Sequence, residues 1–129
     1  MNRVWIPASL LLLVLCTLSC GTSPGRQLQS ITIAKSVSGQ QIQFVATGTY
    51  SAAPTTVSPL PVDWSLGLLA PPPKEYTYTL TSQPYMYDCA NTTLVNPGVV
   101  TALAPIDPNA PGSGTTKKVV AASFPFGCQ

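Results

Sequence analysis

The chain has 129 residues and a formal net charge of +2, and its charged residues make up 8% of the total, against roughly 25% in an ordinary soluble domain. A balance this close to neutral, without a basic cluster, argues against nucleic acid as a partner. The sequence contains no histidine, the commonest general base and a frequent metal ligand. We therefore expect that the protein is not an enzyme and that it has no metal site and no cofactor. The length fits one domain.

The N-terminal segment, residues 1–19, is predicted to be a signal peptide. Arg3 supplies a positive charge at the start, and an apolar run that begins at Val4 is densest over residues 10–15. The run is short for a bilayer span, which needs about 20 apolar residues. A buried N-terminal helix is the alternative, but Pro7 and the abrupt change to a small, polar segment at residues 21–25 favour export.

The end of this segment contains a candidate lipidation site. Residues 17–21, Thr-Leu-Ser-Cys-Gly, resemble a bacterial lipobox, although Thr17 stands where that family usually has Leu. The resemblance implies cleavage before Cys20, a diacylglycerol on its thiol and an acyl chain on its new amine. Because Gly21 stands where Asp would favour the inner membrane, it also implies the outer membrane. Residues 20–27 would be the lipidated cysteine and a short tether; an ordinary cleavage, which leaves a soluble secreted protein, is the alternative.

The cysteine count supports lipidation independently. Cleavage before Cys20 leaves it with Cys89 and Cys128, and an odd thiol is a liability in an oxidising compartment. Lipidation of Cys20 uses the odd thiol and leaves Cys89 and Cys128 to form a disulfide. That bond would close a loop of about 40 residues, worth about 3–4 kcal/mol, and would hold the C-terminal segment 124–126 against the middle of the chain. Two free thiols are the alternative; two cysteines without histidine do not suit a metal site.

The rest of the chain shows an alternation of apolar and polar residues that predicts an all-β domain. The clearest case is residues 41–50, where Ile42, Phe44, Ala46, Gly48 and Tyr50 share one face. Further strands are predicted near residues 28–33, 62–66, 76–80, 99–103 and 119–123, with prolines between them. This spacing is typical of a β-sandwich of about seven short strands. We expect its core to contain Ile42, Phe44 and Trp64.

The order of these segments is similar to that of bacterial Ig-like domains of group 2. Residues 28–33 and 39–50 resemble the family's opening strands, and Val62-Asp63-Trp64-Ser65 resembles its third strand with a core tryptophan. Residues 98–102 and 119–122 resemble the last two strands. The resemblance implies an immunoglobulin-like β-sandwich over residues 28–129. Two segments depart from the family: a longer, tyrosine-rich insert at 67–95 and an extended loop at 105–116.

The insert contains the one cluster that suggests a binding site. Tyr76, Tyr78, Tyr85 and Tyr87 could stack on sugar rings or anchor a protein partner if they shared an exposed face. The structural alternative, which we favour, is that the first pair fills the sandwich and the second covers an edge.

Catalysis would have to depend on four scattered carboxylates, and nothing in the sequence brings two of them together. The glycine-containing segment 112–117 lacks the spacing of a phosphate-binding loop and is predicted to be a turn before the last strand. We therefore expect a non-catalytic lipoprotein of the bacterial cell envelope with a structural, adhesive or protein-interaction role. The alternatives are a carbohydrate-binding module that uses the four tyrosines and an accessory subunit of an envelope complex, paired through a sheet edge.

Overall fold

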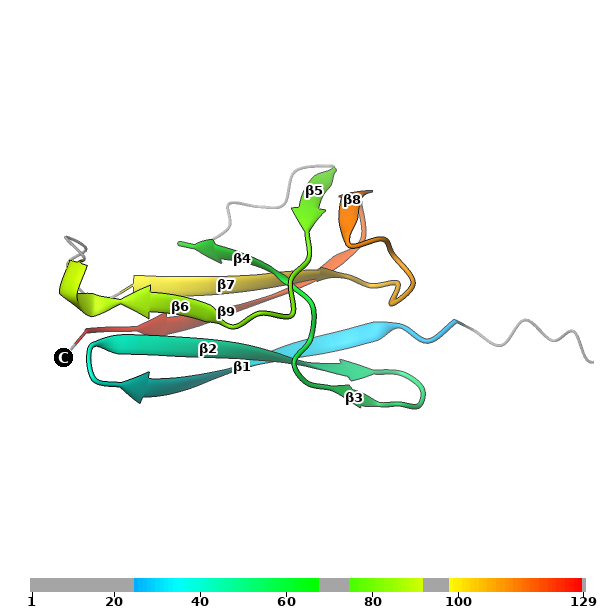
Figure 1. Ribbon diagram of the computed structural model, residues 1–129. Helices are drawn as coiled ribbons and strands as arrows, with labels where there is room; N and C mark the ends of the chain where they lie inside the picture. The colour runs from blue at the N-terminus through cyan, green and yellow to red at the C-terminus, as the bar shows by residue number, and fades with distance from the viewer. Residues whose placement is uncertain (1–24, 68–74, 92–97, 129) are drawn as a thin grey trace, which may run out of the picture.

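The computed structural model describes residues 25–67, 75–91 and 98–128 (Figure 1). The predicted signal peptide and Cys20 lie outside these ranges. Within them the chain forms nine β-strands and one short 3-10 helix, η2 (Cys89–Asn91), and no α-helix. The prediction of an all-β domain is confirmed.

The first sheet is built around β2 (Gln41–Tyr50), which forms a long antiparallel hairpin with β1 (Leu28–Ser38). The hairpin turn uses Gly39 at a φ of 61°, a left-handed conformation that favours glycine. The other edge of β2 pairs with two short strands, β3 (Thr56–Val57) near its end and β6 (Tyr85–Asp88) near its start. All these pairings are antiparallel.

The second sheet contains β7 (Gly98–Pro105) between β4 (Asp63–Leu66) and β9 (Val119–Phe126), again antiparallel. Figure 1 shows this sheet stacked over the first, with the edge strand β1 against β9. With β1, β2 and β6 in one sheet and β4, β7 and β9 in the other, the strands are distributed as in an immunoglobulin-like sandwich. The pairings of these six strands all join residues between Leu28 and Phe126, so this part of the chain contains a complete sandwich.

The core lies between the sheets and follows the alternation along β2. Ile42 is 2% exposed and Phe44 is fully buried, which agrees with their predicted role. The ring of Phe126 meets Phe44 edge-on at a centroid distance of 4.9 Å. Phe126 also fills the space above Gly98, where a Cβ would lie 2.9 Å from the ring. Aromatic rings from both sheets therefore dominate this half of the core.

Trp64, which the sequence predicted to belong to the core, lies at its margin. It is half-buried and packs against the core from the edge strand β4. Its indole N–H donates to the carbonyl oxygen of Gln83 at 3.3 Å, a partner that an edge position provides and a fully apolar interior would not.

The two segments that depart from the family pattern meet in space. β5 (Tyr76–Thr79) from the insert pairs with β8 (Ser113–Thr116) from the extended loop, and Figure 1 shows this ribbon projecting from the sandwich. The turn predicted at residues 112–117 is therefore wrong, because most of that segment is a strand. Gly114 lies under Tyr78, whose hydroxyl oxygen would be 3.3 Å from a Cβ there, so the glycine allows the close approach.

The sandwich has two distinct ends. The entry end is where β1 begins, and it contains Arg26, Leu28, Tyr50, Ile106 and Lys118. The disulfide end, opposite along β1 and β2, contains the Gly39 turn, Cys89 and Cys128.

Candidate functional site

The tyrosines of β6 face the core rather than a ligand surface. The Tyr85 ring lies 6.4 Å from the Phe44 ring and 6.0 Å from that of Trp64. The Tyr87 ring meets Phe126 edge-on at 5.0 Å. Both tyrosines are half-buried, and these contacts extend the aromatic part of the core to the edge of the first sheet.

The tyrosines of β5 lie in the separate ribbon. Tyr78 is only 3% exposed, and the half-buried Tyr76 donates its hydroxyl to Oδ2 of Asp63 at 3.2 Å. Burial, the nearby negative charge of Asp63 and this hydrogen bond raise the pKa of Tyr76 above its usual value. The hydrogen bond ties the ribbon to β4, which contains Asp63.

The four tyrosines do not form one cluster: Tyr76 lies near Tyr78 on β5, and Tyr85 lies near Tyr87 on β6. One pair belongs to the first sheet and the other to the ribbon, and Tyr78 has almost no exposed surface. The described conformation does not place the four rings on one exposed face, so it does not form the aromatic platform that sugar stacking would require.

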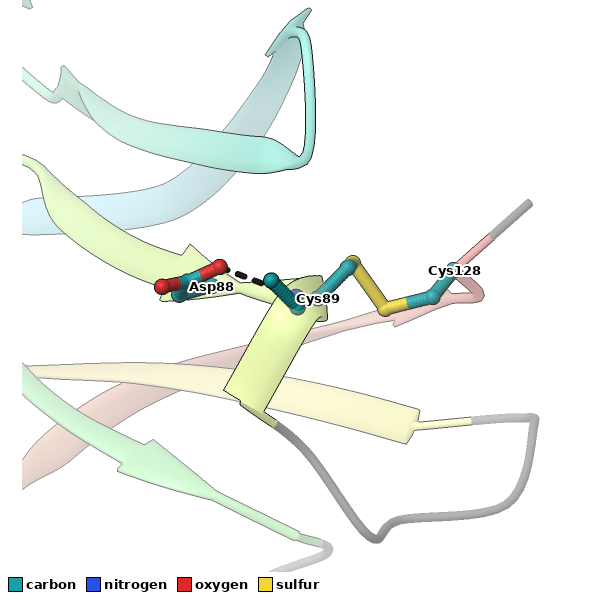
Figure 2. The surroundings of a disulfide bond; sticks show 4 residues. Asp88, Cys89 and Cys128 are labelled. Carbon is teal, nitrogen blue, oxygen red and sulfur yellow. Dashed lines mark hydrogen bonds between the residues drawn. A yellow bond between two sulfur atoms is a disulfide. The ribbon is translucent and has the colours of Figure 1, made fainter.

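The predicted disulfide between Cys89 and Cys128 is present, with the Cα atoms 5.6 Å apart (Figure 2). Cys89 lies in η2, directly after β6 of the first sheet, and Cys128 follows β9 of the second. The bond therefore joins the two sheets at one end of the sandwich. The Cys89 N–H also donates to the Gln40 carbonyl oxygen at 2.8 Å, which fixes η2 to the β1–β2 turn.

The carboxylates that a catalytic site would need have separate local partners. Asp63 accepts the hydrogen bond from Tyr76, and Glu75 lies 3.5 Å from Lys117 in an exposed ion pair. Among the described residues, no group of three or more His, Cys, Asp or Glu side chains is placed to hold a metal ion. Asp88 and Asp107, the other two carboxylates, each accept a hydrogen bond from the backbone N–H of the residue two positions later.

Backbone hydrogen bonds connect the start of the domain to both sheets at the entry end. The Leu28 N–H donates to the Ile106 carbonyl at 2.9 Å, and the Ile106 N–H donates to the Lys118 carbonyl at 3.1 Å. On the other side, the Ser51 N–H donates to the Gln27 carbonyl at 2.9 Å. These bonds place the start of the domain beside residues more than 75 positions away in the sequence.

Arg26 is held in a fixed position at this end. Its guanidinium carbon lies 3.7 Å from the centre of the Tyr50 ring, a cation–π contact. Its Nε donates to the carbonyl oxygens of Ala52 and Pro54 at 3.1 and 3.0 Å. The side chain thus joins the start of the domain to the loop that follows β2.

Two cavities adjoin at Arg26 and Asp107, which line both of them. The first, of about 520 Å³, is polar and is also lined by Lys117 and Lys118. The second, of about 490 Å³, has mainly apolar walls, which include Val57, Leu60, Leu80 and Pro105. Both volumes fall in the range of ligand-binding pockets, about 300–1,000 Å³.

The sequence-based search missed this site. The only sequence feature that points to these cavities is the pair of adjacent basic residues Lys117 and Lys118. The backbone hydrogen bonds through Ile106 bring that pair near the start of the domain.

The chain matches no protein-family model, and comparisons with curated proteins and with solved structures also gave no match. None of the helices in the described ranges is long and apolar enough to cross a membrane.

Proposed function

We propose that the protein is a non-catalytic lipoprotein of the bacterial cell envelope that presents a single Ig-like domain of the group 2 type. The proposal combines the lipobox-like residues 17–21 with the strand motifs and the sandwich that they form. Acylation at Cys20 would hold the protein to the outer membrane, because several buried acyl chains anchor a protein stably.

The observation that carries this proposal is the short distance along the chain between Cys20 and the start of the sandwich. Gly25 is the first described residue, and the five peptide units that separate it from Cys20 span at most about 18 Å. An anchor at Cys20 would thus keep the entry end close to the membrane. The disulfide end would then point away from it.

The exposed apolar side chains favour a protein-interaction or adhesive role for the outward end. Among the described residues the large exposed hydrophobic side chains are Val37, Leu66 and Met86, at 60%, 42% and 52% exposure. All three lie in the half of the sandwich nearer the disulfide: Val37 pairs with Ile42 beside the Gly39 turn, and the other two lie on strand segments at the same end. Exposed apolar side chains at this end are available to contact a protein partner.

The rival roles receive less support. A carbohydrate-binding role through the four tyrosines would need rings that are exposed together, and Tyr78 is buried. An accessory subunit of an envelope complex would pair through a sheet edge, so it is a more specific form of the protein-interaction role rather than a competing one.

Metabolic labelling with palmitate in a bacterial host tests the anchor. We expect the wild-type protein to incorporate label and Cys20→Ala to lose it, because Cys20 provides both the thiol and the amine that are acylated. The matched control is Cys16→Ala, which removes the other cysteine of the N-terminal segment and should keep its label. Equal labelling of wild type and Cys20→Ala would refute the proposed function.

A further inference from the structure

We propose that the polar cavity at the entry end, with Arg26, Lys117 and Lys118 in its wall, binds anionic phospholipid headgroups of the membrane that holds the anchor. This inference rests on the proposed function, because the anchor at Cys20 is what brings the entry end to the bilayer. It adds a second membrane contact, made by the folded domain itself.

The charges of the domain are distributed unevenly along the sandwich. Among the described residues there are four basic side chains, and three of them line this cavity. The fourth, Lys35, lies on β1 near the disulfide end. Two carboxylates, Asp107 in the wall and Glu75 beside Lys117, reduce the local charge to +1. The described ranges contain four carboxylates and so are neutral in sum, which leaves the other described residues at −1; Lys74 lies outside these ranges.

The Nε and Nη2 of Arg26 donate to the carbonyls of Ala52 and Pro54, and the remaining N–H donors of its planar guanidinium suit a phosphate group. The Tyr50 ring and the carbonyls of Ala52 and Pro54 hold that plane at the junction of the two cavities. The rigid position lowers the entropy lost when a ligand binds. Lys118 is kept nearby by the hydrogen bond from Ile106 to its carbonyl oxygen.

The neighbouring cavity matches the other part of a phospholipid. Its wall includes Val57, Leu60 and Leu80, and it meets the polar cavity at Arg26 and Asp107. A phosphate in the polar cavity would leave the glycerol carbons against this apolar wall. Electrostatic attraction to an anionic bilayer acts within a Debye length, about 8 Å at physiological salt, and the short tether allows the entry end to approach that closely.

Vesicle binding by residues 21–129, a chain that contains the complete sandwich but no acyl chain, tests the inference. We expect this chain to bind vesicles of phosphatidylcholine that contain phosphatidylglycerol and not vesicles of phosphatidylcholine alone. The double variant Lys117→Gln with Lys118→Gln should bind the anionic vesicles about 20-fold more weakly, since each basic residue near the surface contributes about a factor of five.

The matched control is Lys35→Gln, which changes the net charge by one unit at the other end and should leave binding unchanged. The inference would be overturned if the chain failed to bind the anionic vesicles. It would also be overturned if Lys35→Gln weakened vesicle binding as much as the single variant Lys118→Gln does. Saturable binding of soluble glycerol phosphate without vesicles, at an affinity equal to that for the anionic vesicles, would also overturn the inference. It would indicate a site for a free phosphate. Because this chain has no acyl group, these results are independent of palmitate labelling at Cys20.

Discussion

The two ends of the sandwich are stabilised in different ways. At the disulfide end, the Cys89–Cys128 bond joins the sheets, and the Phe126 ring packs against both Phe44 and Tyr87. At the entry end, backbone hydrogen bonds through Ile106 connect the sheets, and Arg26 stacks on Tyr50 beside two cavities. Apolar packing and a covalent bond can supply stability, whereas a hollowed polar end can take a ligand. The covalent bond and the aromatic packing are thus concentrated at one end, and the two cavities at the other.

The largest expected effect is the loss of aromatic packing at the disulfide end. Phe126→Ala should lower the free energy of unfolding by about 3–5 kcal/mol, because it leaves a cavity between the sheets. Denaturant unfolding measures the change. The control Phe124→Ala should cost less, since this ring is only half-buried and lies 6.1 Å from Phe44. If both variants lowered the free energy of unfolding equally, burial of the ring would not determine how much its removal destabilises the protein.

Removal of the disulfide should have the next largest effect. Cys89→Ser with Cys128→Ser should lower the free energy of unfolding by about 2–4 kcal/mol, because the unfolded chain gains the entropy of an open loop of about 40 residues. A reducing agent should destabilise the wild type by a similar amount and leave the double variant unchanged. A wild type whose unfolding midpoint is insensitive to reduction would contradict this prediction.

The smallest expected effect is at the entry end. Arg26→Gln should cost about 1–2 kcal/mol, because it removes the cation–π contact with Tyr50 and the hydrogen bonds to the carbonyls of Ala52 and Pro54. Lys35→Gln, at an exposed position on β1, should change stability by less than about 0.5 kcal/mol. Thermal unfolding of the two variants compares them directly. If Arg26→Gln were as mild as Lys35→Gln, the entry end would not depend on this contact.

The sequence predicted the all-β class and the strand with the strongest alternation. Along β2 the residues at even positions are buried and their neighbours are not, so Ile42 and Phe44 were correctly assigned to the core. Trp64, which the same alternation indicated, packs against the core but is only half-buried. A period of two shows which face a residue occupies, but the depth of that face depends on whether the strand is central or at an edge, as β4 is.

The ribbon of β5 and β8 could not be predicted in the same way. The alternation near residues 76–80 predicted the strand β5, but its partner Ser113–Thr116 is far away in the sequence and was predicted to be a turn. The same long-range pairing explains why the sequence left the tyrosines with two interpretations. Only the strand positions decide that Tyr78 is covered while Tyr85 lies against Phe44 and Trp64.

By itself, the sequence determined features that depend on neighbours along the chain: the alternating strands and the lipobox-like residues 17–21. From the cysteine count it also indicated which two thiols form the disulfide. The tertiary structure alone decided that this bond joins two sheets and that Arg26 meets Lys117 and Lys118 at one cavity. The physical reason is range. Alternation and turn preferences act over a few residues, whereas a site assembled from residues 26, 107 and 118 exists only after the sheets have packed.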